Sequence, residues 1–257
     1  MNDNVPAVSR GRIASGLREL GLGSGDSVLV HSSLSSFGYV EGGADAVIDA
    51  LLDAVGPGGN VLVPTLTGTR HDGPDRPPVF DVRSTPCWTG RIPSTLMARP
   101  GARRSLHPTH SVAGIGPDVE NLIAGHEDAP TPCGRQSPYY KLAEQGGYIL
   151  LLGVGQESNT TLHTAEELAE VPYHLQPEPT DAVVIDYAGR RHVKRMYLHD
   201  WGTPRAFSRI DASLLELGIM RVGTIGKATV RLIRSLALLD WLVPVLQQDN
   251  RFLCKKV

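Results

Sequence analysis

The first 66 residues alternate helical and strand patterns, and this alternation limits the possible fold more than any other feature of the chain. Apolar residues recur at helical spacing in residues 9–20 and 43–55, and a glycine follows each segment. Residues 26–33 and 60–66 contain short apolar runs with the length of buried strands. Strand, helix and strand joined by tight turns form a βαβ unit. The sequence therefore predicts an α/β fold with a mainly parallel central sheet flanked by helices.

The rest of the chain is less regular. Residues 67–93 are rich in Gly, Pro and Asp and read as a long irregular loop, which in a compact domain is usually functional or disordered. Whether this loop closes over a substrate is left open. We expect one domain over residues 1–257, with a hairpin and a helical part towards the C-terminus. The further elements that we expect are helices at 92–99 and 118–124, a strand beginning at 148 and a hairpin turn at 188–189.

Composition excludes several classes of protein. The formal net charge is -2, and the arginines at 99, 103 and 104 form only a local cluster, so we expect no nucleic-acid partner. The N-terminus lacks the plan of a secretory signal and no apolar run has the length of a membrane span, which favours a cytoplasmic protein without membrane contact. Cys87, Cys133 and Cys254 have no metal-like or redox spacing and are expected to be free thiols.

His163 stands out in the stretch GGYILLLGVGQESNTTLHTAEELAEVPY, where a strand pattern breaks at Gly153 and Gly155. Thr164 and Glu167 fit a capping box, so a helix should begin within one turn of His163. The positive end of the helix dipole opposes protonation, and a neutral imidazole suits a general base. Three glutamates share or border the helical face of His163 and are able to orient its imidazole ring: Glu166, Glu167 and Glu170. The alternative is a helix-start histidine that is hydrogen-bonded to backbone.

The segment RSLHPTHS, residues 104–111, combines an arginine, hydroxyls and two histidines. His107 and His110 lack a third ligand at a zinc-like spacing, so a turn that binds an anionic ligand through Arg104 fits better than a metal site. A surface loop with capping residues is the alternative. Ser32 and Ser33 follow the first strand, where ligands bind in open α/β sheets, but such hydroxyls are also ordinary helix caps.

These segments together resemble the aminoglycoside 3-N-acetyltransferase family, whose antibiotic N-acetyltransferase fold is distinct from that of the GNAT acetyltransferases. Their order and separation agree from about residue 10 to residue 175, and the run LLLGVG followed by TTLH and AE is the most specific part. The resemblance implies acetyl-CoA as cosubstrate, no metal, and acetylation of the 3-amino group of aminoglycoside antibiotics, which confers resistance.

The resemblance also implies roles for individual residues. His163 corresponds to the general base and Glu166 to its neighbouring carboxylate. Relatives place carboxylates after a late strand where this chain reads YLHDW, so Asp200 is expected to support the base or to bind the cationic sugar. From their place at the start of the expected helix, backbone N–H groups or the hydroxyls of Thr160 or Thr161 are candidate donors to the developing oxyanion. Coenzyme A is expected at Ser32, Ser33, Leu34, Arg104, Ser105, His107, Ser111 and Val112, and the substrate ammonium groups at Asp72, Glu167, Glu170 and Asp200.

Three other functions remain open at this point. The same fold acetylates amines that are not antibiotics in some relatives. A metal-dependent hydrolase would use His107, His110 and His163. A binding protein would sequester an amino sugar without chemistry. The sequence favours a monomer or a homodimer, and it does not rank individual aminoglycosides.

Overall fold

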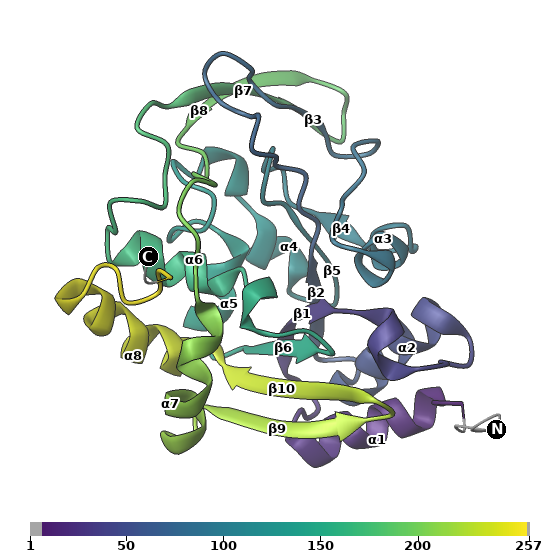
Figure 1. Ribbon diagram of the computed structural model, residues 1–257. Coiled ribbons are helices and arrows are strands. Elements are labelled where there is room, and N and C mark those ends of the chain that lie inside the picture. Colours follow the sequence, from purple (N-terminus) through teal and green to yellow (C-terminus); the bar gives the residue numbers. More distant parts are fainter. Residues whose placement is uncertain (1–6, 256–257) are drawn as a thin grey trace, which may run out of the picture.

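The computed structural model describes residues 7–255 (Figure 1), and residues 1–6 and 256–257, the two ends of the predicted single domain, lie outside the described residues. Within the described residues a seven-stranded sheet carries the strand order β4-β5-β2-β1-β6-β10-β9. Helices cover both faces, which confirms the predicted α/β class. The strands are β1 (Ser27–Ser32), β2 (Asn60–Pro64), β4 (Arg103–Arg104), β5 (Val112–Ile115), β6 (Tyr148–Leu152), β9 (Met220–Ile225) and β10 (Ala228–Arg234).

The sheet is mixed, which corrects the expectation of a mainly parallel sheet. Strand β1 runs parallel to β2 and to β6, whereas β5 is antiparallel to β2 and to β4, and β10 is antiparallel to β6 and to β9. Parallel neighbours need a crossover, and helix α2 (Gly43–Val55) supplies one between β1 and β2. Antiparallel neighbours need only a short turn, such as the one at Gly226 and Lys227. The βαβ pattern therefore describes the centre of the sheet but not its edges.

A second sheet in the described part of the chain has three strands in the order β3-β7-β8, and it lies above the main sheet in Figure 1. The strands are β3 (Val79–Asp81), β7 (Thr180–Ile185) and β8 (Arg191–Met196). Strands β7 and β8 form the predicted hairpin, and Asp186 accepts hydrogen bonds from the backbone of Ala188 and Arg190 in its turn. Because β3 pairs with β7, the long segment 67–93 is tied to this sheet and is not structureless throughout.

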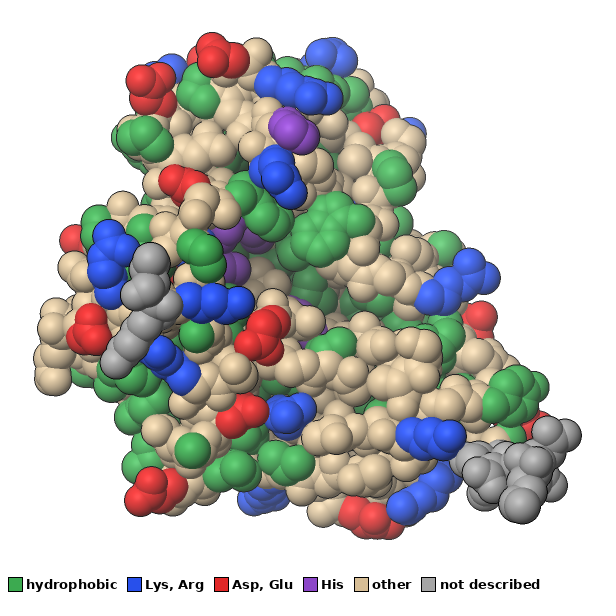
Figure 2. Space-filling view, viewed as in Figure 1, with side chains coloured by type: hydrophobic (Ala, Val, Ile, Leu, Met, Phe, Trp, Pro, Cys, Tyr) green, Lys and Arg blue, Asp and Glu red, His purple; other side chains and the backbone are tan. Residues whose placement is uncertain are grey.

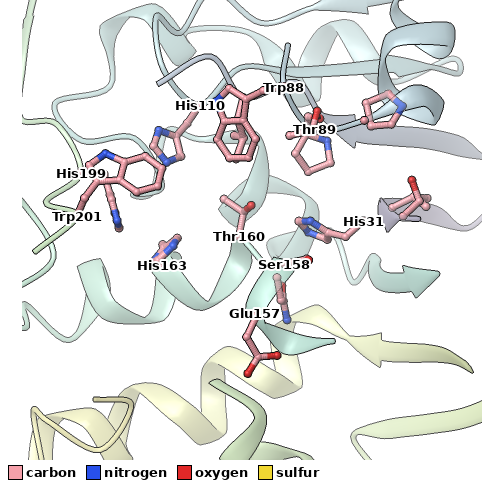
Figure 3. Close-up of a pocket in the computed structure, with 17 residues that line it drawn as sticks. His31, Trp88, Thr89, His110, Glu157, Ser158, Thr160, His163, His199 and Trp201 are labelled. Atoms are coloured by element: carbon pink, nitrogen blue, oxygen red, sulfur yellow. The ribbon is translucent and has the colours of Figure 1, made fainter. Parts of the chain in front are cut away.

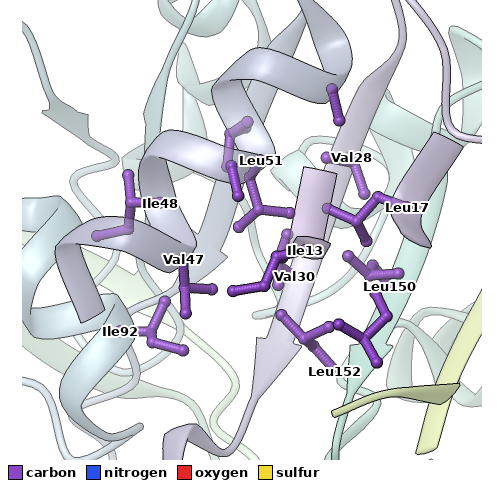
Figure 4. Packing of buried hydrophobic residues seen from close by; sticks show 14 of the residues in the cluster. Ile13, Leu17, Val28, Val30, Val47, Ile48, Leu51, Ile92, Leu150 and Leu152 are labelled. Carbon is purple, nitrogen blue, oxygen red and sulfur yellow. The ribbon is translucent and has the colours of Figure 1, made fainter. Parts of the chain in front are cut away.

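Helices α1 to α3 cover one face of the main sheet, and α4 to α8 cover the other. Alternation along β1 explains this division, because Val28 and Val30 pack against α1 and α2 while Leu29 packs towards Tyr139 of α5. Figure 4 shows the first cluster, in which Ile13 and Leu51 meet the sheet. Burial of such a side chain stabilises the fold by about 1.5–3 kcal/mol.

The helices are α1 (Arg10–Leu20), α2 (Gly43–Val55), α3 (Arg91–Met97), α4 (Val119–Ile123), α5 (Pro138–Glu144), α6 (Thr161–Leu168), α7 (Asp211–Glu216) and α8 (Ser235–Gln248). Single 3-10 turns occupy Leu34–Phe37, Gln156–Ser158 and other connections. The helices that we expected at 92–99 and 118–124 are therefore present as α3 and α4. Among the described residues, no helix is both long and apolar enough to cross a membrane.

Gly153 turns the chain out of β6 towards the residues around His163. Its φ is +75°, in the left-handed region that favours glycine. A Cβ at this position would lie 1.7 Å from the Ser36 hydroxyl, so a larger residue would push apart β6 and the turn after β1. The apolar run and its glycine break thus deliver the next segment to the carboxyl ends of β1 and β6.

Candidate functional site

A cavity of about 350 Å³ opens where the parallel strands β1, β2 and β6 end. Figure 2 shows histidine side chains deep in a hollow on this face, with hydrophobic side chains beside them. The carboxyl ends of parallel strands are where α/β enzymes bind their ligands. The lining residues labelled in Figure 3 are His31, Trp88, Thr89, His110, Glu157, Ser158, Thr160, His163, His199 and Trp201.

His163 lies in the first turn of α6, with 18% of its side chain exposed towards the cavity. The helix begins at Thr161, so the capping box that we inferred from Thr164 and Glu167 is wrong. Glu167 accepts a hydrogen bond from the backbone N–H of Cys133 instead. The prediction that a helix begins within one turn of His163 is confirmed.

The Glu166 carboxylate holds the ring of His163 by a short hydrogen bond. Nδ1 of His163 lies 2.6 Å from Oε2 of Glu166, whose side chain is fully buried. Since an ionised carboxylate is only an acceptor, Nδ1 carries the proton and Nε2 keeps its lone pair. The chain therefore presents the basic nitrogen of an oriented, neutral imidazole.

Two opposing effects set the charge of this pair. Burial lowers the pKa of His163, and the hydrogen bond to Glu166 offsets part of that effect. Burial would also raise the pKa of Glu166, but its contacts with His163 and His174 outweigh burial and hold that pKa well below the usual range. Glu166 is thus ionised while His163 is neutral near pH 7, the state that a general base requires.

Glu166 has two further neighbours, the guanidinium of Arg205 and the imidazole of His174. Nε of Arg205 lies 3.2 Å from its Oε1, and Nδ1 of His174 lies 3.2 Å from its Oε2. His174 also contacts Glu167, with 3.1 Å between Nε2 and Oε1. A buried carboxylate without partners would be strongly destabilising, so this network accounts for the tolerance of Glu166 inside the protein.

Three more histidines surround the cavity in neutral form. Burial lowers the pKa of His31 to about 3, with a smaller contribution from His163. Burial likewise lowers the pKa values of His110 and His199 far below their ordinary value. Neutral rings so close to His163 avoid like-charge repulsion when it accepts a proton.

Arg104 is not a phosphate partner, which corrects the prediction from RSLHPTHS. Its side chain is buried, and its guanidinium donates to the carbonyls of Thr65 and Thr85 and to the hydroxyl of Ser111. The same group lies 4.7 Å from the centre of the Phe80 ring. Arg104 therefore ties the segment after β2 to β4 and β5.

The other coenzyme positions in this segment are also structural. Ser105 bonds to Nδ1 of His126 and accepts from the backbone of Val112, which is itself buried in β5. His107 is buried and stacks on His126 with 4.4 Å between ring centres, while Ser111 donates to the Thr65 carbonyl. The structure does not favour coenzyme binding through Ser105, His107, Ser111 and Val112, because all four side chains are buried inside the protein.

Ser32, Ser33 and Leu34 lie where the sequence predicted a ligand. They line a groove of about 550 Å³ that shares Ser32 and Gly90 with the cavity. Among the described residues, the Ser32 hydroxyl is buried without a hydrogen-bond partner, so a ligand atom is its natural partner. Gly43, the first residue of α2, and the exposed Arg91 line the same groove; the Arg91 guanidinium offers donors for phosphate, whereas the Gly43 N–H already donates to the Val40 carbonyl.

The predicted ammonium-binding carboxylates lie elsewhere. Glu167 and Glu170 line a second cavity behind α6, which is the side away from His163. Asp72 accepts from the backbone of Thr69, and Asp200 accepts from the backbone of Gly202. Asp72 and Asp200 thus accept hydrogen bonds within turns, and the four carboxylates do not form one cluster at the cavity. Asp72 lines a small pocket with His110, His199 and Trp201, which also line the cavity. The hydrogen bond from Gly202 argues against Asp200 as the carboxylate partner of the base.

Thr161 is buried outside the cavity lining, and its backbone N–H donates to Asn159. The predicted oxyanion donor therefore does not reach the cavity by its side chain. The neighbouring Thr160 does line the cavity. Helix α6 begins between the two threonines and turns their side chains in different directions.

The histidines do not favour a metal centre of the kind considered from the sequence. His107 stacks on His126, away from His163. Within the described residues, His163, His174 and His199 are the group whose donor atoms lie within 4.8 Å of one another. The ring nitrogens of His174, however, both face carboxylates, and His163 donates Nδ1–H to Glu166. Hydrogen bonds to carboxylates thus occupy Nδ1 of His163 and Nε2 of His174.

Several cavity residues escaped the sequence analysis. Trp88 belongs to the irregular segment and Trp201 follows the hairpin, and their ring centres lie 6.5 Å apart at the cavity mouth. Glu157 precedes α6 in a 3-10 turn. A tryptophan in a polar, turn-rich segment is itself a signal of binding, but the 112 residues between the two hid their contact. His174 carried no recognisable spacing to His163.

A cavity with an oriented histidine–glutamate pair, set at the carboxyl edge of a helix-flanked sheet, defines an α/β enzyme. The family model described as aminoglycoside 3-N-acetyltransferase matches residues 29–247. The chain belongs to this family, as the sequence predicted.

Relatives and solved structures agree with this assignment. Aminoglycoside N(3)-acetyltransferase VIII of Streptomyces fradiae is 34% identical over 256 residues, which cover 89% of this chain and 88% of the relative. A mutant of aminoglycoside acetyltransferase AAC(3)-IVa in complex with gentamicin superposes with a TM-score of 0.82 at 32% identity, over 96% of this chain and 92% of that one. The structure of AAC-IIIb with CoASH superposes with a TM-score of 0.81 at 30% identity, over 95% of this chain and 97% of that one.

Proposed function

We propose that the protein transfers the acetyl group of acetyl-CoA to the 3-amino group of an aminoglycoside antibiotic and thereby confers resistance, with His163 as general base. The observation that carries this proposal is the 2.6 Å hydrogen bond between His163 and the buried Glu166 at the wall of the cavity. The names of the relatives and the gentamicin and CoASH complexes of two structural neighbours support the reaction and both substrates.

His163 accepts the proton of the attacking amine at Nε2, because Nδ1 is already bonded to Glu166. Glu166 stabilises the imidazolium that forms without taking the proton itself. The thioester of acetyl-CoA is already activated, so the protein needs no acyl-enzyme. The amine nitrogen bonds to the carbonyl carbon, the C–S bond breaks, and coenzyme A leaves as a thiolate that takes up a proton. Thr160 lines the cavity beside the base and is our candidate donor to the carbonyl oxygen as it gains negative charge.

Two tryptophan side chains and one carboxylate hold the aminoglycoside, which is the acceptor of the acetyl group. Trp88 and Trp201 are 54% and 44% exposed at the mouth of the cavity, ready to cover the apolar face of a sugar ring and to attract its ammonium groups. Among the described residues that line the cavity, Glu157 is the one carboxylate, and Figure 3 places it across from Trp88. We assign Glu157 to a second ammonium group of the acceptor.

The coenzyme occupies the groove along Ser32, Ser33 and Leu34. Donors for its phosphates come from the guanidinium of Arg91. Ser32 lines both the groove and the cavity, so it lies where the acetyl end of the coenzyme has to enter. Because acetyl-CoA is an intracellular metabolite, we propose action in the cytoplasm, by a monomer or a homodimer.

The test is mass spectrometry of an amine panel incubated with the protein and acetyl-CoA. The panel contains several aminoglycosides and simple amines that are not antibiotics. The proposal requires a gain of one acetyl group, located at the 3-amino group by fragmentation. Acetylation confined to the simple amines would replace the antibiotic by another acceptor, and a protein that binds aminoglycosides without a product would be a sequestering protein.

Replacing Trp201 by alanine is expected to raise KM for the aminoglycoside about fivefold, because loss of one aromatic contact costs on the order of 1 kcal/mol. The value of kcat should stay near wild type, since the indole lies at the mouth of the cavity. Steady-state kinetics measures both values. Trp201→Phe should restore most of the affinity, and Tyr197→Ala, a partly exposed aromatic outside the cavity lining, should change neither. An unchanged KM in Trp201→Ala contradicts the acceptor placement.

Replacing Arg91 by alanine is expected to raise KM for acetyl-CoA about tenfold or more, because a charge-assisted phosphate contact contributes roughly 1.5–3 kcal/mol. KM for the aminoglycoside should not move. Arg70→Ala serves as the control, since Arg70 is an exposed arginine outside the groove. Equal effects of the two arginine variants would mean that the groove does not hold the coenzyme phosphates.

A further inference from the structure

His174 is a buried histidine that the proposed reaction does not use. Its side chain is 1% exposed and lies on the far side of Glu166 from the cavity. Nδ1 lies 3.2 Å from Oε2 of Glu166, the same oxygen that bonds His163, and Nε2 lies 3.1 Å from Oε1 of Glu167. The rings of His174 and His163 stack with 4.8 Å between their centres.

Two carboxylates flank this ring, and both are almost fully buried. The exposed fractions of the Glu166 and Glu167 side chains are 0% and 4%. Arg205 supplies one positive charge, at 3.2 Å from Glu166. A buried carboxylate that lacks a cation is costly, so a second positive charge is needed to balance the pair. His174, with a ring nitrogen towards each carboxylate, is placed to provide that charge.

We propose that His174 is a positioning residue that stays protonated between Glu166 and Glu167 and thereby keeps His163 neutral and correctly oriented. This inference rests on the proposed role of His163 as general base. An imidazolium stacked on His163 repels a second positive charge there, while it also shares the carboxylate oxygen that would otherwise stabilise that charge. His174 thus prevents Glu166 from making His163 so basic that it binds a proton permanently.

The surroundings agree with a charged His174. Burial alone would lower its pKa, but the contacts with Glu166 and Glu167 outweigh burial and leave that pKa raised. His163 and His199, which pack against the ring, have lowered pKa values. The titratable or charged groups that face the two stacked rings are His31, His110, Glu166, Glu167, His199 and Arg205.

The first test reads the protonation of His174 directly in the intact protein. Nitrogen-15 NMR of histidine-labelled enzyme separates imidazolium from neutral rings by the shifts of Nδ1 and Nε2. We expect both nitrogens of His174 to carry protons at pH 7, where His163 is neutral. A neutral His174 at pH 7 overturns the proposal, whatever the enzyme acetylates.

The second test is the pH profile of kcat/KM for His174→Gln, whose side-chain amide retains a donor for Glu167 without the charge. Removal of a like charge next to His163 should move the acid limb of the profile to higher pH by about one unit, which is a tenfold loss of activity on that limb. The plateau at high pH should stay within a few-fold of wild type.

Two controls separate this proposal from a structural effect and from the failure of the proposed function. His192→Gln removes a histidine that pairs with Asp186 at 3.0 Å outside both cavities, and its profile should match wild type. Glu167→Gln leaves the His174 ring in place but removes one carboxylate, so it should shift the acid limb in the same direction if His174→Gln fails to fold. A lower plateau with an unmoved limb refutes the proposal. A wild-type enzyme that acetylates no amine refutes the proposed function instead, and leaves the NMR test of His174 intact.

Discussion

Replacing His163 by alanine is expected to lower kcat about 10²- to 10⁴-fold, which is the usual contribution of a positioned general base. The physical reason is that an amine is protonated near pH 7 and needs an acceptor for its proton before it attacks a thioester. The affinity for coenzyme A should hardly change, because the groove that we assign to the coenzyme lies along Ser32, Ser33 and Leu34. Stopped-flow or steady-state assays of thiol release measure kcat, and calorimetry measures the affinity for coenzyme A.

The control for this variant is His71→Ala, because His71 is an exposed histidine in the 67–93 segment. The His71→Ala variant should acetylate the aminoglycoside as fast as the wild type. The pH dependence of the wild type gives a further check. Because burial lowers the pKa of His163, wild-type kcat/KM should stay high down to about pH 6.5, which is the ordinary pKa of histidine, and should fall only at lower pH. Near wild-type turnover in His163→Ala would remove the general-base assignment.

Replacing Arg104 by alanine is expected to destabilise the fold by about 3 kcal/mol or more. The buried guanidinium serves two backbone carbonyls and a serine hydroxyl, and each acceptor left unsatisfied costs roughly 1–3 kcal/mol. Urea unfolding followed by circular dichroism gives the change in the free energy of unfolding. KM for acetyl-CoA should stay close to wild type in the fraction that remains folded.

The neighbouring Arg103 provides a matched control. Its side chain is half exposed and pairs with Glu120 at 2.7 Å, and a surface pair of this kind contributes less than about 1 kcal/mol. Arg103→Ala should therefore unfold at almost the wild-type urea concentration. A stable Arg104→Ala with a much higher KM for acetyl-CoA would restore the phosphate-binding role that the sequence suggested.

The sequence predicted the fold well wherever local pattern and tertiary packing agree. The helices α1 and α2 and the strands β1 and β2 lie where apolar periodicity placed them, because each buries its apolar side against the others. The direction of the edge strands was not predictable from periodicity, since an apolar strand reads alike in a parallel or an antiparallel pair. That is why a mainly parallel sheet was expected and a mixed one is present.

The site was predictable in part. His163 and Glu166 are three residues apart on one helix, so local spacing revealed their contact. Arg104 misled because sequence does not distinguish an arginine that binds an anion from one that binds backbone carbonyls; only burial does. Trp88 and Trp201 come together through the packing of the second sheet, which no local pattern encodes. The predictions for the acidic residues failed for a similar reason. The sequence does not distinguish a carboxylate that accepts a backbone hydrogen bond in a turn from one that binds a substrate cation.

Ser32 and Gly90 belong to the walls of both the cavity and the groove. With the acceptor in one hollow and the coenzyme in the other, each substrate has an opening of its own, and neither blocks the other from entering or leaving. The kinetics should then be sequential with no fixed order of addition. The shared wall also means that one molecule, made by joining an amino sugar to the sulfur of coenzyme A through a short linker, would fill both hollows at once. Such a conjugate should inhibit far more tightly than either half, because the second half binds without a further loss of translational freedom.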